Sequence, residues 1–115
     1  MGAGLALLCC PAATVALLVG AALETPAALT VARIGGAGLF ALGVACWIAR
    51  TDTQSRAARG LVAAMLLYDV AAAAILAWAG IGLGLHGVAL WPAVVLHAAM
   101  TVWCTACLRS WKSCQ

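Results

Sequence analysis

Charged residues are scarce in this chain. Among its 115 residues only six are Lys or Arg and three are Asp or Glu, whereas 67% are hydrophobic. A soluble domain needs far more polar surface than this composition supplies. The few basic residues also form no basic face, so we do not expect nucleic acid as a partner. The composition therefore predicts a protein whose exterior is solvated by lipid.

Long polar stretches are lacking as well, because four apolar segments fill most of the chain. A helix that crosses the hydrocarbon layer needs about 20 apolar residues. The segments that meet this length are residues 3–23, 27–49, 61–81 and 88–108. None alternates polar and apolar residues as the strands of a membrane barrel do, and the short connections favour antiparallel neighbours. We expect an all-α, integral membrane, up-down-up-down four-helix bundle that forms a single transmembrane domain over residues 1–115.

Basic residues are absent from the first and third connections between these segments. Arg50, Arg56 and Arg59 surround the second connection, and Arg109 and Lys112 follow the fourth segment. The positive-inside rule places such residues in the cytoplasm, and four spans then place the N-terminus there too. No Lys or Arg precedes the first apolar run, so we interpret it as a membrane span and not as a secretory signal. We expect a multi-pass protein of a bacterial-type inner membrane with both termini cytoplasmic.

Few ionisable side chains interrupt the apolar segments. At a rise of about 1.5 Å per residue, Arg33, Asp69 and His97 lie at similar depths below one membrane boundary. A lone charge inside the bilayer costs about 2.5–3.5 kcal/mol on insertion scales, so pairing of Arg33 with Asp69 is the cheapest arrangement. Tyr68 supplies a further hydrogen-bonding group, and Thr101 shares a helix face with His97. These five residues form the predicted buried polar network.

The predicted network has more than one possible role. A pair between Arg33 and Asp69 fixes the relative orientation of two helices, whereas ionisable residues within spans often line proton or substrate pathways. The sequence leaves both possibilities open. In addition, the segment AVVLHAAMTVW around His97 resembles the pigment-ligating helix of bacterial antenna proteins. This resemblance implies that His97 binds a cofactor, either a pigment or a haem; apart from it, the sequence identifies no cofactor.

Cysteine, in contrast, is abundant, with six residues. In the predicted orientation all six lie in or near the cytoplasmic half, where reducing conditions disfavour disulfides. They are then either packing residues or ligands of soft metal ions. The segment LLCCPAATVALLVGAA resembles the first helix of small mercuric-ion inner-membrane transporters, which carry an adjacent cysteine pair near a proline and a second pair at the cytoplasmic side. The resemblance implies metal ligation by Cys9 and Cys10, with the second pair drawn from Cys104, Cys107 and Cys114.

Motifs of the common enzyme classes are missing. The sequence has no Ser-His-Asp spacing, phosphate loop or His-Glu zinc motif, so we do not expect an enzyme. The expected function is that of a non-catalytic subunit or accessory protein of a membrane assembly, in contact with membrane lipids and with other membrane subunits or copies of itself. Two alternatives are a thiol-based transporter of Hg or Cu ions and a membrane subunit that binds a pigment or haem through His97.

Overall fold

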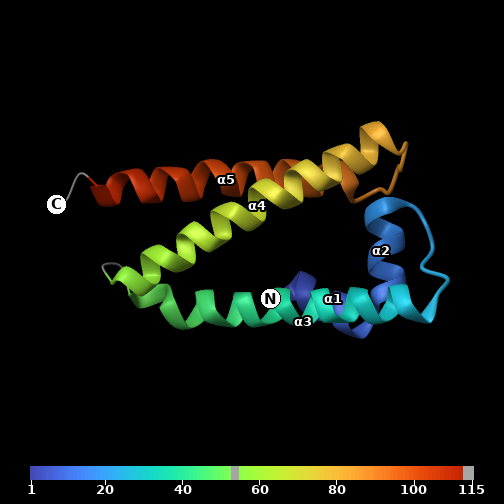
Figure 1. The fold of residues 1–115 in the computed structure, drawn as a ribbon, viewed down its shortest axis with the longest axis horizontal. Helices are drawn as coiled ribbons and strands as arrows, with labels where there is room; N and C mark the ends of the chain where they lie inside the picture. Colours follow the sequence, from blue (N-terminus) through green and yellow to red (C-terminus); the bar gives the residue numbers. More distant parts are fainter. Residues whose placement is uncertain (53–54, 113–115) are drawn as a thin grey trace.

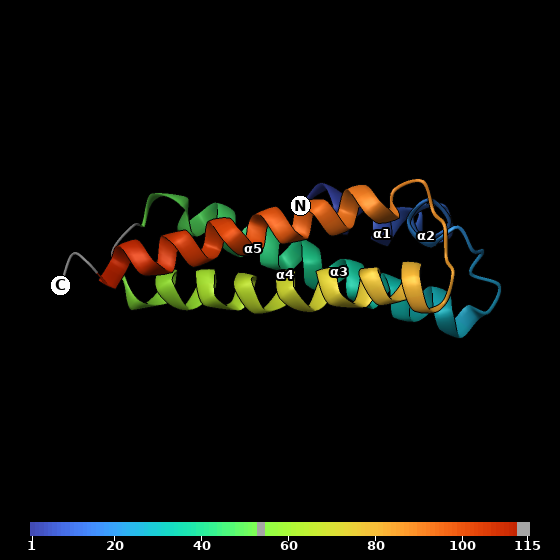
Figure 2. The ribbon, with the colours of Figure 1, turned by 90° about the horizontal axis from the view of Figure 1, so that it is seen from above.

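The computed structural model describes residues 1–52 and 55–112, apart from the side chain of Lys112. All of its regular elements in these residues are helices. They are α1 (Gly2–Cys9), α2 (Pro11–Val19), α3 (Pro26–Ile48), the short 3-10 helix η1 (Ala49–Thr51), α4 (Arg56–Gly82) and α5 (Leu90–Lys112). The molecule is elongated, with extents of 51 × 27 × 18 Å. Helices α3 and α5 run along its long axis in both views, and α4 runs obliquely from the end of α3 towards the start of α5 in Figure 1 (Figures 1 and 2).

Three of these helices, α3, α4 and α5, are each long and apolar enough to cross a membrane, and the bent pair α1–α2 forms a fourth apolar segment. The long helices pack antiparallel. The structure therefore confirms the predicted fold class of an all-α membrane bundle, and the chain is a small multi-pass membrane protein by helix length and composition. We name its two ends: the loop end holds η1 and the start of α4, and the turn end holds the connections over residues 20–25 and 83–89 (Figure 1).

The starts of α3 and α4 follow from local sequence. The Thr25 hydroxyl accepts a hydrogen bond from the Ala28 N–H at 3.2 Å, and Pro26 occupies the first helical position, where its missing N–H has no consequence. Ser55 caps α4 in the same way, accepting from the Ala58 N–H at 3.0 Å. These caps place both helix starts at the ends of the membrane segments.

The first apolar segment is not one straight helix, in contrast to the expectation for residues 3–23. It breaks at Cys10, where the chain bends by 116° between α1 and α2. Cys10 has φ −131° and ψ 60° because the ring of Pro11 disfavours helical geometry in the residue before it. Helix α1 then lies along α3, whereas α2 turns across the molecule towards α5 (Figure 1). Because of this break, a single apolar segment contacts α3 through α1 and approaches α5 through α2.

Glycine allows α1 to approach α3 closely. A Cβ atom added to Gly36 would lie 2.9 Å from the backbone nitrogen of Leu8, and one added to Gly4 would lie 2.5 Å from the backbone nitrogen of Phe40. About two turns after Gly36 along α3, Gly43 packs against Met1. Small residues at such positions let helix backbones meet in membranes. Gly36 is therefore a point where the backbones of α1 and α3 meet.

Helix α2 links this α1–α3 pair to the α4–α5 pair at the turn end. The Ala89 N–H donates to the Leu17 carbonyl at 2.9 Å, and Gly87 lies directly against the Leu18 carbonyl. Elsewhere the two pairs share little contact, since the extensive packing is within each pair. Among the described residues the buried apolar side chains are only Pro11, Ala58, Ala79, Leu90 and Cys104. The chain thus consists of two packed pairs with little common core.

Candidate functional site

The polar centre of the molecule joins α4 to α5. Asp69 on α4 is 2% exposed, and one of its carboxylate oxygens, Oδ1, lies 2.8 Å from Nδ1 of His97 on α5. The His97 side chain is 21% exposed. In apolar surroundings such a contact is electrostatically stronger than in water because little solvent competes with it. Asp69 and His97 therefore form the principal polar link between these two helices.

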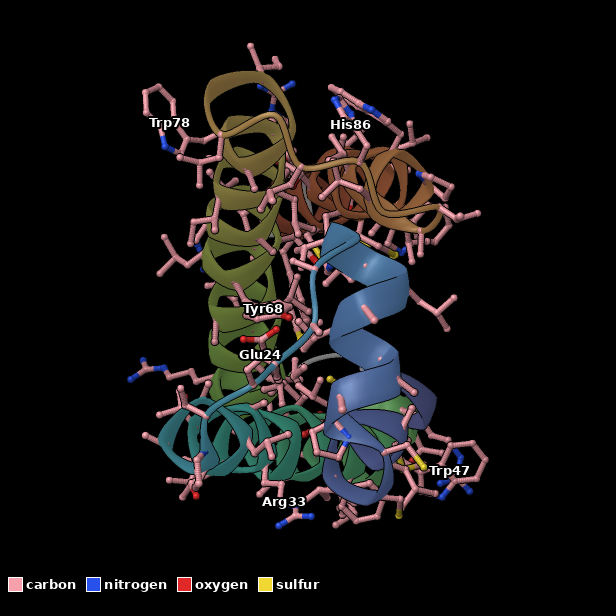
Figure 3. All side chains as sticks on the ribbon, turned by 90° about the vertical axis from the view of Figure 1, so that its right-hand side faces the viewer. Glu24, Arg33, Trp47, Tyr68, Trp78 and His86 are labelled. Atoms are coloured by element: carbon pink, nitrogen blue, oxygen red, sulfur yellow. The ribbon has the colours of Figure 1, made fainter. Side chains whose placement is uncertain are left out.

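Tyr68 and Thr101 flank this pair. The ring of Tyr68 meets the His97 ring edge to face, with centroids 5.6 Å apart, and Figure 3 shows Tyr68 directed from α4 towards the interior of the molecule. Thr101 donates its hydroxyl proton to the His97 carbonyl at 2.9 Å. Of the predicted polar network, the structure thus brings Asp69, His97 and Tyr68 together, and it ties Thr101 to the backbone of His97.

The second carboxylate oxygen of Asp69 has no partner among the residues that the structure describes. Oδ2 is fully buried and makes no hydrogen bond among the described residues. The contact through Oδ1 also leaves Nε2 as the nitrogen of His97 that Asp69 does not engage. A carboxylate that holds one nitrogen of a histidine orients the ring for a ligand at the other nitrogen. Within the pair, Asp69 Oδ2 and His97 Nε2 therefore take no part in the contact between the two side chains. Binding of a pigment or haem to His97 stays a prediction.

Arg33 lies outside this centre. It is exposed on α3 and points away from the other helices (Figure 3). Within the described residues it makes no ion pair with Asp69, whose partner is His97. The reason is the rotation of α3. Gly36 turns one face of the helix towards α1, and Leu42 faces the α4–α5 pair; Arg33 precedes Leu42 by nine residues, about two and a half turns, and so projects from the opposite side.

The predicted metal ligands are not gathered into one group. Cys9 and Cys10 are exposed at the junction of α1 and α2, whereas Cys104 is buried and Cys107 half-buried on α5. No set of three His, Cys, Asp or Glu side chains among the described residues is placed to hold a metal ion. Cys114 lies outside the described residues.

A second feature, which the sequence did not reveal, is a cleft between the two helix pairs. Its volume is about 590 Å³, and its walls come from α1, α3, α4 and α5, with Arg50 of η1 at the loop end. Tyr68 lines the cleft and also touches His97, so the cleft adjoins the polar centre. Nothing in the spacing of these residues marks them as neighbours, because the cleft depends on how the two pairs diverge.

Comparison with protein family models, with curated proteins and with solved structures finds no match to this chain.

Proposed function

We propose that the chain is a non-catalytic subunit or accessory protein of an inner-membrane assembly, and that it associates through the lateral faces of its helices with other membrane subunits or with copies of itself. The observation that carries the proposal is the small internal core. In the most apolar window of α3 and of α4 only 6% of residues are buried, and in α5 only 11%. Helices in membranes associate through van der Waals packing, and most packing surface of these helices is unused within the chain.

Exposed positions on α3 support lateral association. Nothing lies within 4 Å of a Cβ atom added to Gly38, and Ala41 and Ile34 on the same face are exposed. Two membrane helices approach each other closely where such small residues are free. The face is therefore open to a neighbouring helix in a way that the Gly36 face, already covered by α1, is not.

The arrangement of basic residues supports the proposed orientation. Arg50 and Arg56 lie at the loop end, and the C-terminal part of α5, which carries Arg109, reaches the same end (Figure 1). Because basic residues favour the cytoplasmic side, we propose that this end faces the cytoplasm and that both termini are cytoplasmic.

The proposal is tested by the mass of the protein extracted in a mild detergent from the membranes in which it is expressed. Native mass spectrometry is expected to show the chain in complexes with other subunits or with itself. Gly38→Leu is expected to weaken these complexes, whereas Gly60→Leu, which also adds a side chain in open space, serves as the matched control. A monodisperse single chain in mild detergent and in lipid nanodiscs would refute the proposal.

A further inference from the structure

The cleft between the two helix pairs has the size of a small-molecule site. Its volume of about 590 Å³ falls within the range of ligand pockets, roughly 300–1,000 Å³. It lies between segments that are apolar enough to cross a membrane, so the molecules that reach it laterally are lipids. The cleft is also independent of the open Gly38 face, and its role therefore does not rest on the proposed function.

The walls of the cleft suit a flexible apolar chain. All three methionines of the protein line it: Met1, Met65 on α4 and Met100 on α5. Methionine is unbranched and adapts to irregular shapes, which is why it is common where a surface accepts variable apolar partners. The remaining lining residues are largely apolar as well, apart from the loop end. An acyl chain is the occupant that such walls accommodate best.

A guanidinium group stands at the loop end of the cleft. Arg50 is the only charged side chain among the described lining residues. Its Nη1 donates to the Trp47 carbonyl at 2.9 Å, and the guanidinium carbon lies 4.2 Å from the centroid of the Trp47 ring. These contacts hold the guanidinium in place and engage few of its five N–H donors. Within the described residues no carboxylate neutralises Arg50, so the cleft ends in a fixed, unpaired positive charge.

We propose that the cleft binds one phospholipid with an anionic headgroup. The lipid phosphate lies on Arg50, beside Trp47 at the level where tryptophan and basic residues meet the headgroups, and one acyl chain runs between the helix pairs past Met65 and Met100. Planar guanidinium groups bind phosphate through paired hydrogen bonds. Arg50 thus binds the anionic headgroup, and the apolar walls of the cleft contact the acyl chain of the same lipid. The lipid fills space that the protein's own side chains leave open.

The test compares phosphatidylglycerol with phosphatidylcholine of identical acyl chains. After delipidation, the full chain is titrated with each lipid and the retained molecules are counted by native mass spectrometry. We expect one phosphatidylglycerol per chain, retained with a preference of about fivefold, the effect of one basic residue near an anionic lipid. Arg50→Gln removes this preference and Arg50→Lys restores most of it. Arg56→Gln, a nearby arginine on α4 outside the cleft, leaves it unchanged.

A second variant tests the acyl-chain site with the arginine intact. Leu42→Trp fills the cleft and is expected to abolish retention of the tightly bound lipid, whereas Leu67→Trp, on an exposed position of α4, has no effect. Helical circular dichroism confirms that each variant is folded. The proposal is overturned by equal retention of the two lipids, by retention that neither Arg50→Gln nor Leu42→Trp reduces, or by glycerol phosphate without acyl chains binding as tightly as the lipid.

Discussion

Helices α1 and α3 meet through glycine backbones, whereas α4 and α5 are joined by a contact between polar side chains. In the first pair Gly4 and Gly36 remove the Cβ atoms that would keep the two helices apart. In the second pair Asp69 and His97 bridge the helices at 2.8 Å. The contact between α1 and α3 depends on shape alone, whereas the contact between α4 and α5 requires that the buried carboxylate of Asp69 keeps its partner. The two halves of this small bundle should therefore fail for different reasons.

The largest effect is expected in the polar pair. His97→Leu removes the partner of Asp69 Oδ1 and leaves the buried carboxylate unpaired, since Oδ2 has no partner in the described part of the chain. Removal of one partner of a buried pair is strongly destabilising, here by about 3 kcal/mol in the free energy of unfolding. Titration with SDS in mixed micelles, followed by circular dichroism, measures this loss. An unchanged midpoint would mean that the contact contributes nothing.

A smaller effect is expected in the glycine contact. Gly36→Ala places a methyl group 2.9 Å from the backbone of Leu8, and backbone atoms yield less readily than side-chain ends. Overpacking of this kind costs about 1–2 kcal/mol, and here it acts by pushing α1 off α3. Gly38→Ala on the open side of the same helix is the matched control. Cross-linking between cysteines introduced into α1 and α3 reports the separation, and equal cross-linking in both variants would contradict the close approach.

The comparison also shows what the sequence was able to predict. The three long helices, their apolar length and the grouping of Asp69, His97 and Tyr68 followed from hydropathy and from depth along each segment, because the bilayer imposes both. Depth does not define rotation about the helix axis. For that reason the pairing of Arg33 with Asp69 was a plausible prediction from charge, yet the structure pairs Asp69 with His97 instead. The rotation of α3 depends on its contact with α1, which hydropathy does not describe.

The break at Cys10 was the other feature that the sequence left undetermined. Pro11 gave a local signal, but prolines are tolerated within membrane helices when neighbours satisfy the freed backbone groups. Here the Cys10 N–H still donates to the Ala6 carbonyl and the Cys10 carbonyl accepts from the Thr14 N–H, so both sides of the bend retain hydrogen bonds. The direction of α2, and with it the cleft, depends on contacts with the distant Gly87 and Ala89.

The most direct test of this account is a double-mutant cycle across α4 and α5. Asp69→Leu, His97→Leu and the double variant are compared in the same SDS titration, with Arg33→Leu combined with Asp69→Leu as the second cycle. We predict a coupling of about 1–3 kcal/mol between Asp69 and His97, visible as a double variant more stable than His97→Leu alone, and no coupling between Arg33 and Asp69. Coupling to Arg33, or additive effects of Asp69 and His97, would contradict the arrangement described.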